Sequence, residues 1–274
     1  MRRLELQLEM SKKGLWALPI RELQFAQESS MKMVHSPIVT AFVTALFASL
    51  GIGSNVVLAN TVSVSQLAGV LSVQKPDGSI RVLSPKSEIS SGDVLSTQRD
   101  SFAEIKFSDG AKVTLKPNTS VKIETFIFQE AEPAKDSFVY GLLKGGLRAV
   151  TGLVGKRNPD AYRLGTATAT IGIRGTTFTA DDCISSECLA ADGGRVEQGV
   201  IVGVQDGEIV ASNQAGSQNF LAGQFGMMDS AERRPRFLST DPGLQFAPPA
   251  SFIQSLNTGS AVNAGRSLEC VVRR

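Results

Sequence analysis

Three sets of residues in this 274-residue chain have types and spacing that could do chemistry. Cys183 and Cys188 form a closely spaced pair, Asp181 and Asp182 are adjacent carboxylates, and Arg174 lies in a glycine-rich stretch of β-branched residues. A cysteine pair can form a disulfide, a redox couple or half of a metal site. Paired carboxylates can serve acid/base catalysis or bind calcium. An arginine can bind a carboxylate or several carbonyls with a planar set of donors.

The rest of the chain supplies few partners for catalysis. Its one histidine is His35, upstream of the region with globular composition, so Ser-His-Asp and Cys-His arrangements and His-based metal shells cannot be built there. Adjacent residues of a strand point to opposite faces, so we expect Asp181 and Asp182 to be structural or solvated. Gly145-Gly146 lacks the Lys-Ser/Thr of a phosphate loop and indicates a bend between strands. We predict no enzymatic activity, no cofactor and no metal.

The cysteine pair encloses only four residues, Ile184 to Glu187. The spacing matches neither a CxxC redox motif nor a zinc pattern. We therefore expect a disulfide between Cys183 and Cys188, formed in an oxidising compartment. The third cysteine, Cys270, stands alone near the end of the chain.

Residues 31–59 have the parts of a secretory signal peptide: a short positive segment, an apolar segment and a small-x-small exit. Cleavage is expected between Ala59 and Asn60, and residues 1–30 would then be an artefact of start-site choice. The alternative is an uncleaved membrane anchor, since the largely apolar residues 38–59 approach the roughly 20 residues of a spanning helix. With either outcome we expect the bulk of the protein to be exported, periplasmic or secreted.

The exported part carries no net charge. Six of the 28 basic and four of the 26 acidic residues precede Asn60, which leaves 22 of each sign. A balanced chain lacks the clustered positive charge that attracts nucleic acid or anionic membranes. We therefore predict no nucleic-acid partner, and contact with a membrane only through residues 38–59 if they are uncleaved.

From Val62 to Met228 the chain alternates short apolar and polar runs, punctuated by turn residues such as Asp77-Gly78 and Asp109-Gly110. This pattern predicts an all-β domain over residues 60–230, built as a sandwich or a flattened β-solenoid of short strands. Residues 231–274 are rich in proline and predict an extended, largely unstructured tail that can also dock as a strap.

The stretch TATATIGIRGTTF, residues 166–178, predicts a central strand. Alternation places four of its residues on one face, where small side chains allow close packing: Ala167, Ala169, Ile171 and Ile173. Arg174 falls on the opposite face, where its guanidinium can clamp a carboxylate or backbone carbonyls at a bend that Gly175 permits. The alternative role of Arg174 is a contact with a partner. The structural motif as a whole comprises Gly172, Arg174, Gly175 and Thr176.

Several motifs together resemble one family. They are SGDVLST at 91–97, SFAEIKFSDGAKVTLKPNTSVKI at 101–123, GLLKGGLRAVTG at 141–152, TATATIGIRGTTF at 166–178, GEIV at 207–210 and LAGQFGMM at 221–228. Over residues 69 to about 228 the chain resembles the FecR domain, a periplasmic module of regulators that relay signals to sigma factors. The resemblance implies an all-β, solenoid-like fold, in agreement with the alternation of the strands.

Signal-relaying members of that family carry a cytoplasmic helical segment before their membrane helix, and the roughly 35 residues before the apolar run are too few for it. The resemblance therefore implies a stand-alone, exported, non-enzymatic protein that binds or scaffolds an envelope protein partner. The alternative is a membrane-anchored regulator of a sigma factor. A third alternative is a polysaccharide binder, which would need an exposed aromatic platform at Tyr140, Tyr162 or Phe128.

Overall fold

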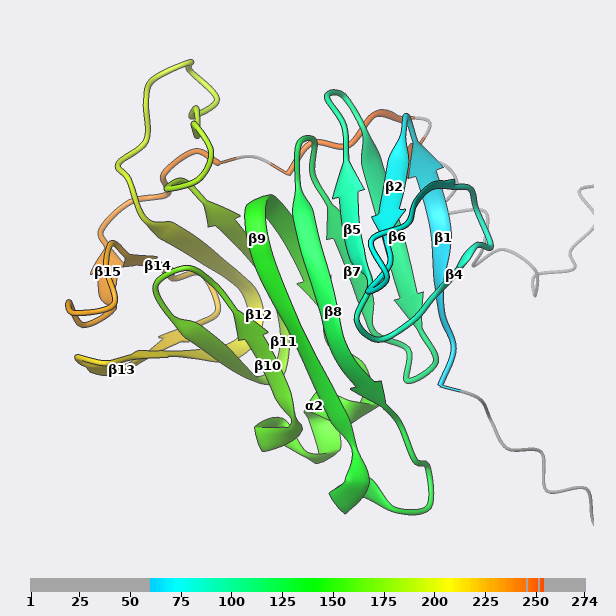
Figure 1. The fold of residues 1–274 in the computed structure, drawn as a ribbon. Helices are drawn as coiled ribbons and strands as arrows, with labels where there is room; N and C mark the ends of the chain where they lie inside the picture. Colours follow the sequence, from blue (N-terminus) through cyan, green and yellow to red (C-terminus); the bar gives the residue numbers. More distant parts are fainter. Residues whose placement is uncertain (1–59, 245, 251, 254–274) are drawn as a thin grey trace, which may run out of the picture. The chain divides into compact units, whose positions relative to one another are not determined.

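The structure is a computed structural model that describes residues 60–244, 246–250, 252 and 253 (Figure 1). The expected signal segment, Ala59, residues 1–30, Cys270 and the part of the tail beyond residue 253 lie outside the described residues. The regular secondary structure of the described part is almost entirely strand, which confirms the all-β prediction.

The named elements of this part are fifteen strands, the short α-helix α2 and two 3-10 helices, and hydrogen bonds join all the strands into one continuous sheet. In chain order the elements are β1 (Val62–Ala68), β2 (Leu71–Gln74), β3 (Ile80–Leu83), β4 (Glu88–Ile89), β5 (Val94–Thr97), β6 (Phe102–Phe107), β7 (Lys112–Leu115), β8 (Ser120–Ile127), η1 (Pro133–Lys135), β9 (Ser137–Val150), α2 (Leu153–Arg157), η2 (Pro159–Ala161), β10 (Tyr162–Gly165), β11 (Thr170–Asp182), β12 (Val200–Asn213), β13 (Gly216–Leu221), β14 (Phe225–Met228) and β15 (Arg236–Leu238). Neither α2 nor the 3-10 helices have the length and hydrophobicity needed to cross a membrane.

The sheet folds back on itself into two layers. Layer A has the strand order β3-β2-β5-β8-β9-β10-β11-β12-β13. Layer B has the order β4-β1-β6-β7-β9-β11-β12-β14-β15. The long strands β9, β11 and β12 belong to both layers, with one half in each. The fold thus combines the two architectures that the sequence left open, because the layers face each other as in a sandwich and the strands turn corners as in a solenoid.

The long strands change layer where a glycine takes a positive φ. These corners are Gly145 in β9 (φ 81°), Gly175 in β11 (φ 63°) and Gly207 in β12 (φ 77°). Glycine adopts such angles without the steric cost that a Cβ brings. Strand β9 pairs with β8 up to Lys144 and with β11 from Gly145 onward. This change of partner confirms the bend predicted at Gly145-Gly146.

One hydrophobic core lies between the layers. Phe107 of β6, in layer B, packs against Phe126 of β8 and Phe138 of β9, in layer A, with ring centroids 5.0 and 4.3 Å apart. Side chains alternate between this core and solvent along most strands, as expected for sheets with one covered face.

The described part of the C-terminal region, which the sequence assigned to a Pro-rich tail, contributes β15 and then runs along layer B (Figure 1). The Phe246 ring packs edge-to-face on Phe102 of β6 at 6.3 Å, and the guanidinium of Arg148 lies 6.0 Å from the same ring. Phe252 is buried, with its ring 6.1 Å from Phe102. These aromatic contacts hold residues 246–252 against the outer side of layer B.

Candidate functional site

The loop after β11 is closed by a disulfide between Cys183 and Cys188, as predicted. In the loop-closure view, a bridge around so few residues contributes about 2 kcal/mol. The buried carboxylate of Asp182 accepts hydrogen bonds from the backbone amides of Ile184 and Ser185, at 2.9 and 3.2 Å. Asp182 therefore shapes the first turn of this loop, which we call the cysteine loop (residues 183–188).

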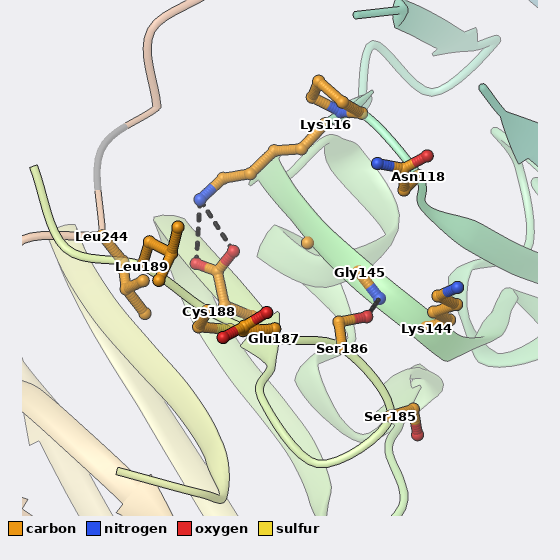
Figure 2. Close-up of a pocket in the computed structure, with 13 residues that line it drawn as sticks. Lys116, Asn118, Lys144, Gly145, Ser185, Ser186, Glu187, Cys188, Leu189 and Leu244 are labelled. Atoms are coloured by element: carbon orange, nitrogen blue, oxygen red, sulfur yellow. Dashed lines mark hydrogen bonds and ion pairs between the residues drawn. The ribbon is translucent and has the colours of Figure 1, made fainter. Parts of the chain in front are cut away.

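A cavity of about 470 Å³ lies between the cysteine loop, the β7–β8 connection and the bend of β9 (Figure 2). Lys116 Nζ donates to both carboxylate oxygens of Asp181, at 2.7 and 3.0 Å, and the Gly145 amide donates to Ser186 Oγ at 3.1 Å. Glu187, on the cavity rim, pairs with Arg195. The contact of Gly145 with Ser186 anchors the cysteine loop to the bend of β9.

Asp181 and Asp182 serve different partners, so they do not share a proton or an ion. Burial raises the pKa of Asp181, while the charge and the hydrogen bond of Lys116 act in the opposite direction. Among the described residues, no group of three or more His, Cys, Asp and Glu side chains is placed to hold a metal ion. Both carboxylates therefore stabilise the loop region.

The structure corrects the clamp predicted at Arg174. Ala169, Ile171 and Ile173 are buried, but Arg174 is exposed on the outer face of layer A, and its side chain makes no hydrogen bond or ion pair with a described residue. Its cross-strand neighbour Glu208 accepts a hydrogen bond from the side-chain amide of Asn219 instead. The outer face is open to solvent at this point, so no carboxylate or carbonyl closes on the guanidinium.

Ala167, expected on the buried face, is exposed and precedes the start of β11 at Thr170. Gly172 lies on the outer face of β11, opposite Val210. The buried Thr176 follows the corner at Gly175, where its amide donates to Thr151 Oγ1 at 2.9 Å and its carbonyl accepts from the Thr151 amide at 3.0 Å. These bonds tie the corner of β11 to the end of β9.

The clamp chemistry expected of Arg174 is performed by Arg157, at the end of α2. Its Nε and Nη2 donate to the two carboxylate oxygens of Asp136 at 2.8 and 3.1 Å. Its Nη1 and Nη2 also donate to the carbonyls of Glu130 and Gln129, at 3.0 and 2.6 Å, and its guanidinium lies 4.6 Å from the Phe128 ring. No local pattern in the sequence predicts this site, since the partners of Arg157 come from 20 to 30 residues upstream.

We expect Arg157→Ala to lower the free energy of unfolding by about 2 kcal/mol, because it removes charge-assisted hydrogen bonds and leaves the buried Asp136 carboxylate uncompensated. Arg174→Ala is the matched control and should change it by less than about 0.5 kcal/mol, as surface substitutions do. Urea denaturation of both variants measures the difference. A loss at Arg174 equal to the loss at Arg157 would restore the original clamp assignment.

The aromatic platform required for a polysaccharide binder is absent from the three expected positions. Tyr140 and Tyr162 are 0% and 1% exposed, and their hydroxyls hydrogen-bond to each other. Burial raises the pKa of both phenols, so both remain protonated. The ring of Phe128 lies under the guanidinium of Arg157. None of the three can stack on a sugar.

The most accessible apolar feature is β3, at the edge of layer A. Within the described residues it pairs with β2 alone, and its Ile80 and Val82 side chains are each 70% exposed. The Lys75 amide donates to the Ser79 carbonyl at 2.8 Å, which makes these residues a hydrogen-bonded pair. Because bonded and non-bonded pairs alternate in an antiparallel ladder, the N–H and C=O groups of Ile80 and Val82 point away from β2.

The other edges of the described sheet are shorter or blocked. Arg234 donates twice to the carbonyl of Ser217 and so covers the edge of β13. β4 has two residues and β15 three, and Phe237 of β15 packs on Phe220. Natural proteins usually protect edge strands in such ways, so an unprotected apolar edge marks a surface for pairing. We take the β3 edge as the candidate functional site.

Parts of the chain are similar to solved structures and to one protein family. Among the curated proteins none matches the chain. Of the solved structures, a cell surface anchoring domain is 27% identical with a TM-score of 0.22, over 23% of this chain and 83% of that domain. Two crystal structures of a proposed anti-sigma factor from Parabacteroides distasonis are each 11% identical, with TM-scores of 0.40 and 0.39. These alignments cover 54% of this chain and 60% of that protein, so the chain spans less than two thirds of its length.

The FecR protein family model matches residues 93–217, from the residue before β5 to the second residue of β13. The matched segment contains the bent strands β9, β11 and β12 and the motif at Gly172 to Thr176. The resemblance predicted from the sequence is thereby confirmed for residues 93–217, which match the FecR protein family.

Proposed function

We propose that this FecR-domain chain is an exported, non-enzymatic protein that binds another protein of the cell envelope through the free edge of β3. Residues 93–217 match the FecR family, and the resemblance to that family implies a regulator, which supports a binding role. The observation that carries the proposal is the unpaired edge of β3 with its two exposed β-branched side chains. The export expected from residues 31–59 would bring this edge into the envelope.

In the proposed mode, an extended segment of the partner adds a strand beside β3. Its backbone would bond to the outward N–H and C=O groups of Ile80 and Val82, which supplies affinity. Its side chains would pack beside the exposed Ile80 and Val82 side chains, which supplies specificity. The guanidinium of Arg81 donates to the Glu88 carbonyl of β4 at 3.2 Å. The Arg81 side chain therefore points to layer B, and we do not expect it to contact the partner.

Two substitutions at one position test this mode. Val82→Lys keeps the outward N–H but places a charge on the edge, and Val82→Pro removes the outward donor while keeping an apolar side chain. We expect each to lower the affinity of the full chain for its envelope partner at least tenfold, about 1.4 kcal/mol. Saturable capture from envelope extract, followed by titration with the recovered protein, measures the effect.

The control is Leu221→Lys, which changes an exposed aliphatic residue at the blocked edge of β13. It should bind like the unmodified chain, and all three variants should keep its melting temperature. Normal binding by Val82→Pro would rule out strand addition at β3. The absence of any saturable protein partner would reject the proposed function itself.

A further inference from the structure

A second surface lies on the outer face of layer A, five strands away from β3, which is roughly 24 Å at the usual strand spacing. It is a hollow of about 860 Å³ over β10, β11 and β12, bounded on one side by α2 and η2. Its charged residues are Lys156, Asp160, Arg163 and Arg174, and we call it the basic hollow.

The cations of the basic hollow come from three elements and have no partners in the described part of the chain. Lys156 lies at the end of α2, Arg163 on β10 and Arg174 on β11, and all three are exposed. None of them makes an ion pair or a side-chain hydrogen bond with a described residue. Asp160 is the one acidic side chain of the lining. Three cations that line one hollow repel one another, and an anion in the hollow would relieve that repulsion.

The floor of the basic hollow contains Gly172, which leaves space there because it has no side chain. Neither its backbone conformation nor its packing requires glycine. At Gly172 the φ angle is not positive, and a Cβ would meet only the Val210 carbonyl, at an ordinary contact distance of 3.9 Å. A β-branched residue would suit this strand position better. Glycine there leaves open the space beside Arg163 and Arg174, with the hydroxyls of Thr170 and Ser212 on the same floor.

The chemistry of the basic hollow selects its ligand. β10, β11 and β12 are paired on both sides, so an extended peptide would find no free backbone groups there. A neutral sugar would find no ring to stack on, because Tyr162 is buried beneath the floor. Guanidinium groups bind carboxylate and phosphate in paired hydrogen bonds, and hydroxyl and carboxylate groups bind sugar hydroxyls. We propose that the basic hollow binds an acidic saccharide, a sugar that carries a carboxylate or a phosphate.

Calorimetric titration of the full chain tests this with glucuronic acid, glucose 6-phosphate, glucose and inorganic phosphate. We expect one of the two acidic sugars to bind at least tenfold more tightly than glucose or phosphate alone, and binding to weaken as salt is added. Tighter binding of glucuronic acid would identify a carboxylate-bearing saccharide. Tighter binding of glucose 6-phosphate would identify a phosphate-bearing one.

Two variants locate the site. Arg163→Gln/Arg174→Gln removes two charges, Gly172→Val fills the floor, and each should weaken acidic-sugar binding at least tenfold with an unchanged melting temperature. Lys86→Gln/Arg99→Gln removes two exposed charges elsewhere and should bind normally, as should Val82→Lys at the β3 edge. The proposal is overturned if neither acidic sugar binds, if inorganic phosphate binds as tightly as the sugar phosphate, or if the site variants bind normally. Tighter binding of hexaglutamate than of either sugar would also overturn it, in favour of an acidic polypeptide.

Discussion

Lys116→Met is expected to lower the free energy of unfolding by about 3–5 kcal/mol at neutral pH, because it leaves the buried charge of Asp181 without its partner. Lys116 Nζ lies 2.7 Å from the Asp181 carboxylate, and the two side chains are 13% and 9% exposed. Methionine keeps the length of the lysine stem, so the loss measures the missing charge and hydrogen bonds. Urea denaturation near pH 7 gives the value.

The loss should depend on pH in a defined direction. Burial raises the pKa of Asp181 above its ordinary value of 3.8, and Lys116 is the one neighbour that lowers it. Without Lys116 the pKa in the folded state rises further, while the unfolded value stays the same. A carboxyl with a raised folded pKa costs stability as pH rises through that pKa, so the penalty of Lys116→Met should be smallest in acid and grow toward neutrality.

Two comparisons isolate the cause of this loss. Lys135→Met breaks an ion pair with Glu132 of the same 2.7 Å length, but both side chains are at least 55% exposed, and the loss should be below about 1 kcal/mol. Adding Asp181→Asn to Lys116→Met should recover most of the stability, because a neutral amide costs less to bury. A pH-independent loss, or no recovery in the double variant, would mean that Lys116 acts through packing.

Gly207→Ala is expected to cost about 3–4 kcal/mol, the sum of a left-handed backbone penalty and overpacking at a corner. Gly207 has a φ of +77°, and a Cβ there would lie 2.4 Å from the carbonyl oxygen of Gly175, at the neighbouring corner of β11. The carbonyl oxygen belongs to the backbone and the Cβ position is fixed by the backbone of residue 207, so the two corners would have to separate. Chemical denaturation of the purified variant measures the cost.

Gly110→Ala is the matched control for this substitution. Gly110 has a φ of +87° in the β6–β7 turn, but a Cβ there would meet nothing within 4 Å. This variant should lose about 1–2 kcal/mol, the backbone penalty alone. Equal losses at Gly110 and Gly207 would show that the contact between the corners does not constrain the fold.

The sequence predicted the features that depend on neighbouring residues. Alternation of side chains gave the all-β class, and the turn residues Asp77-Gly78 and Asp109-Gly110 fall in the β2–β3 and β6–β7 turns, where each glycine has a positive φ. The short spacing between Cys183 and Cys188 predicted the disulfide that joins them. These features follow from steric preferences and chain connectivity over a few residues, and such local properties can be predicted from a single sequence.

Sequence reasoning failed where a side chain depends on a partner far along the chain. It assigned a clamp to Arg174 from its place in a motif, but the clamp belongs to Arg157, whose carboxylate partner is Asp136. It also read Asp181 as structural or solvated without finding Lys116, which lies 65 residues away. The pairing of β9 with β7 and β11 brings Lys116 to Asp181, and the parallel pairing of β9 with β10 returns the chain after Arg157 to the start of β9, beside Asp136. Such pairings are a property of the whole sheet.

The sequence by itself determined that this chain is an all-β protein with glycine bends, a closed cysteine loop and the motifs of a FecR domain. Only the tertiary structure decided which edge remains free and which charges remain unpaired. Whether an exposed residue such as Val82 or Arg174 is available to a partner depends on what covers its strand. That cover comes from segments distant in sequence, such as Arg234 over the edge of β13. Local conformational preferences determine where strands form. Packing between segments distant in sequence determines which strand edges and side chains remain exposed for binding.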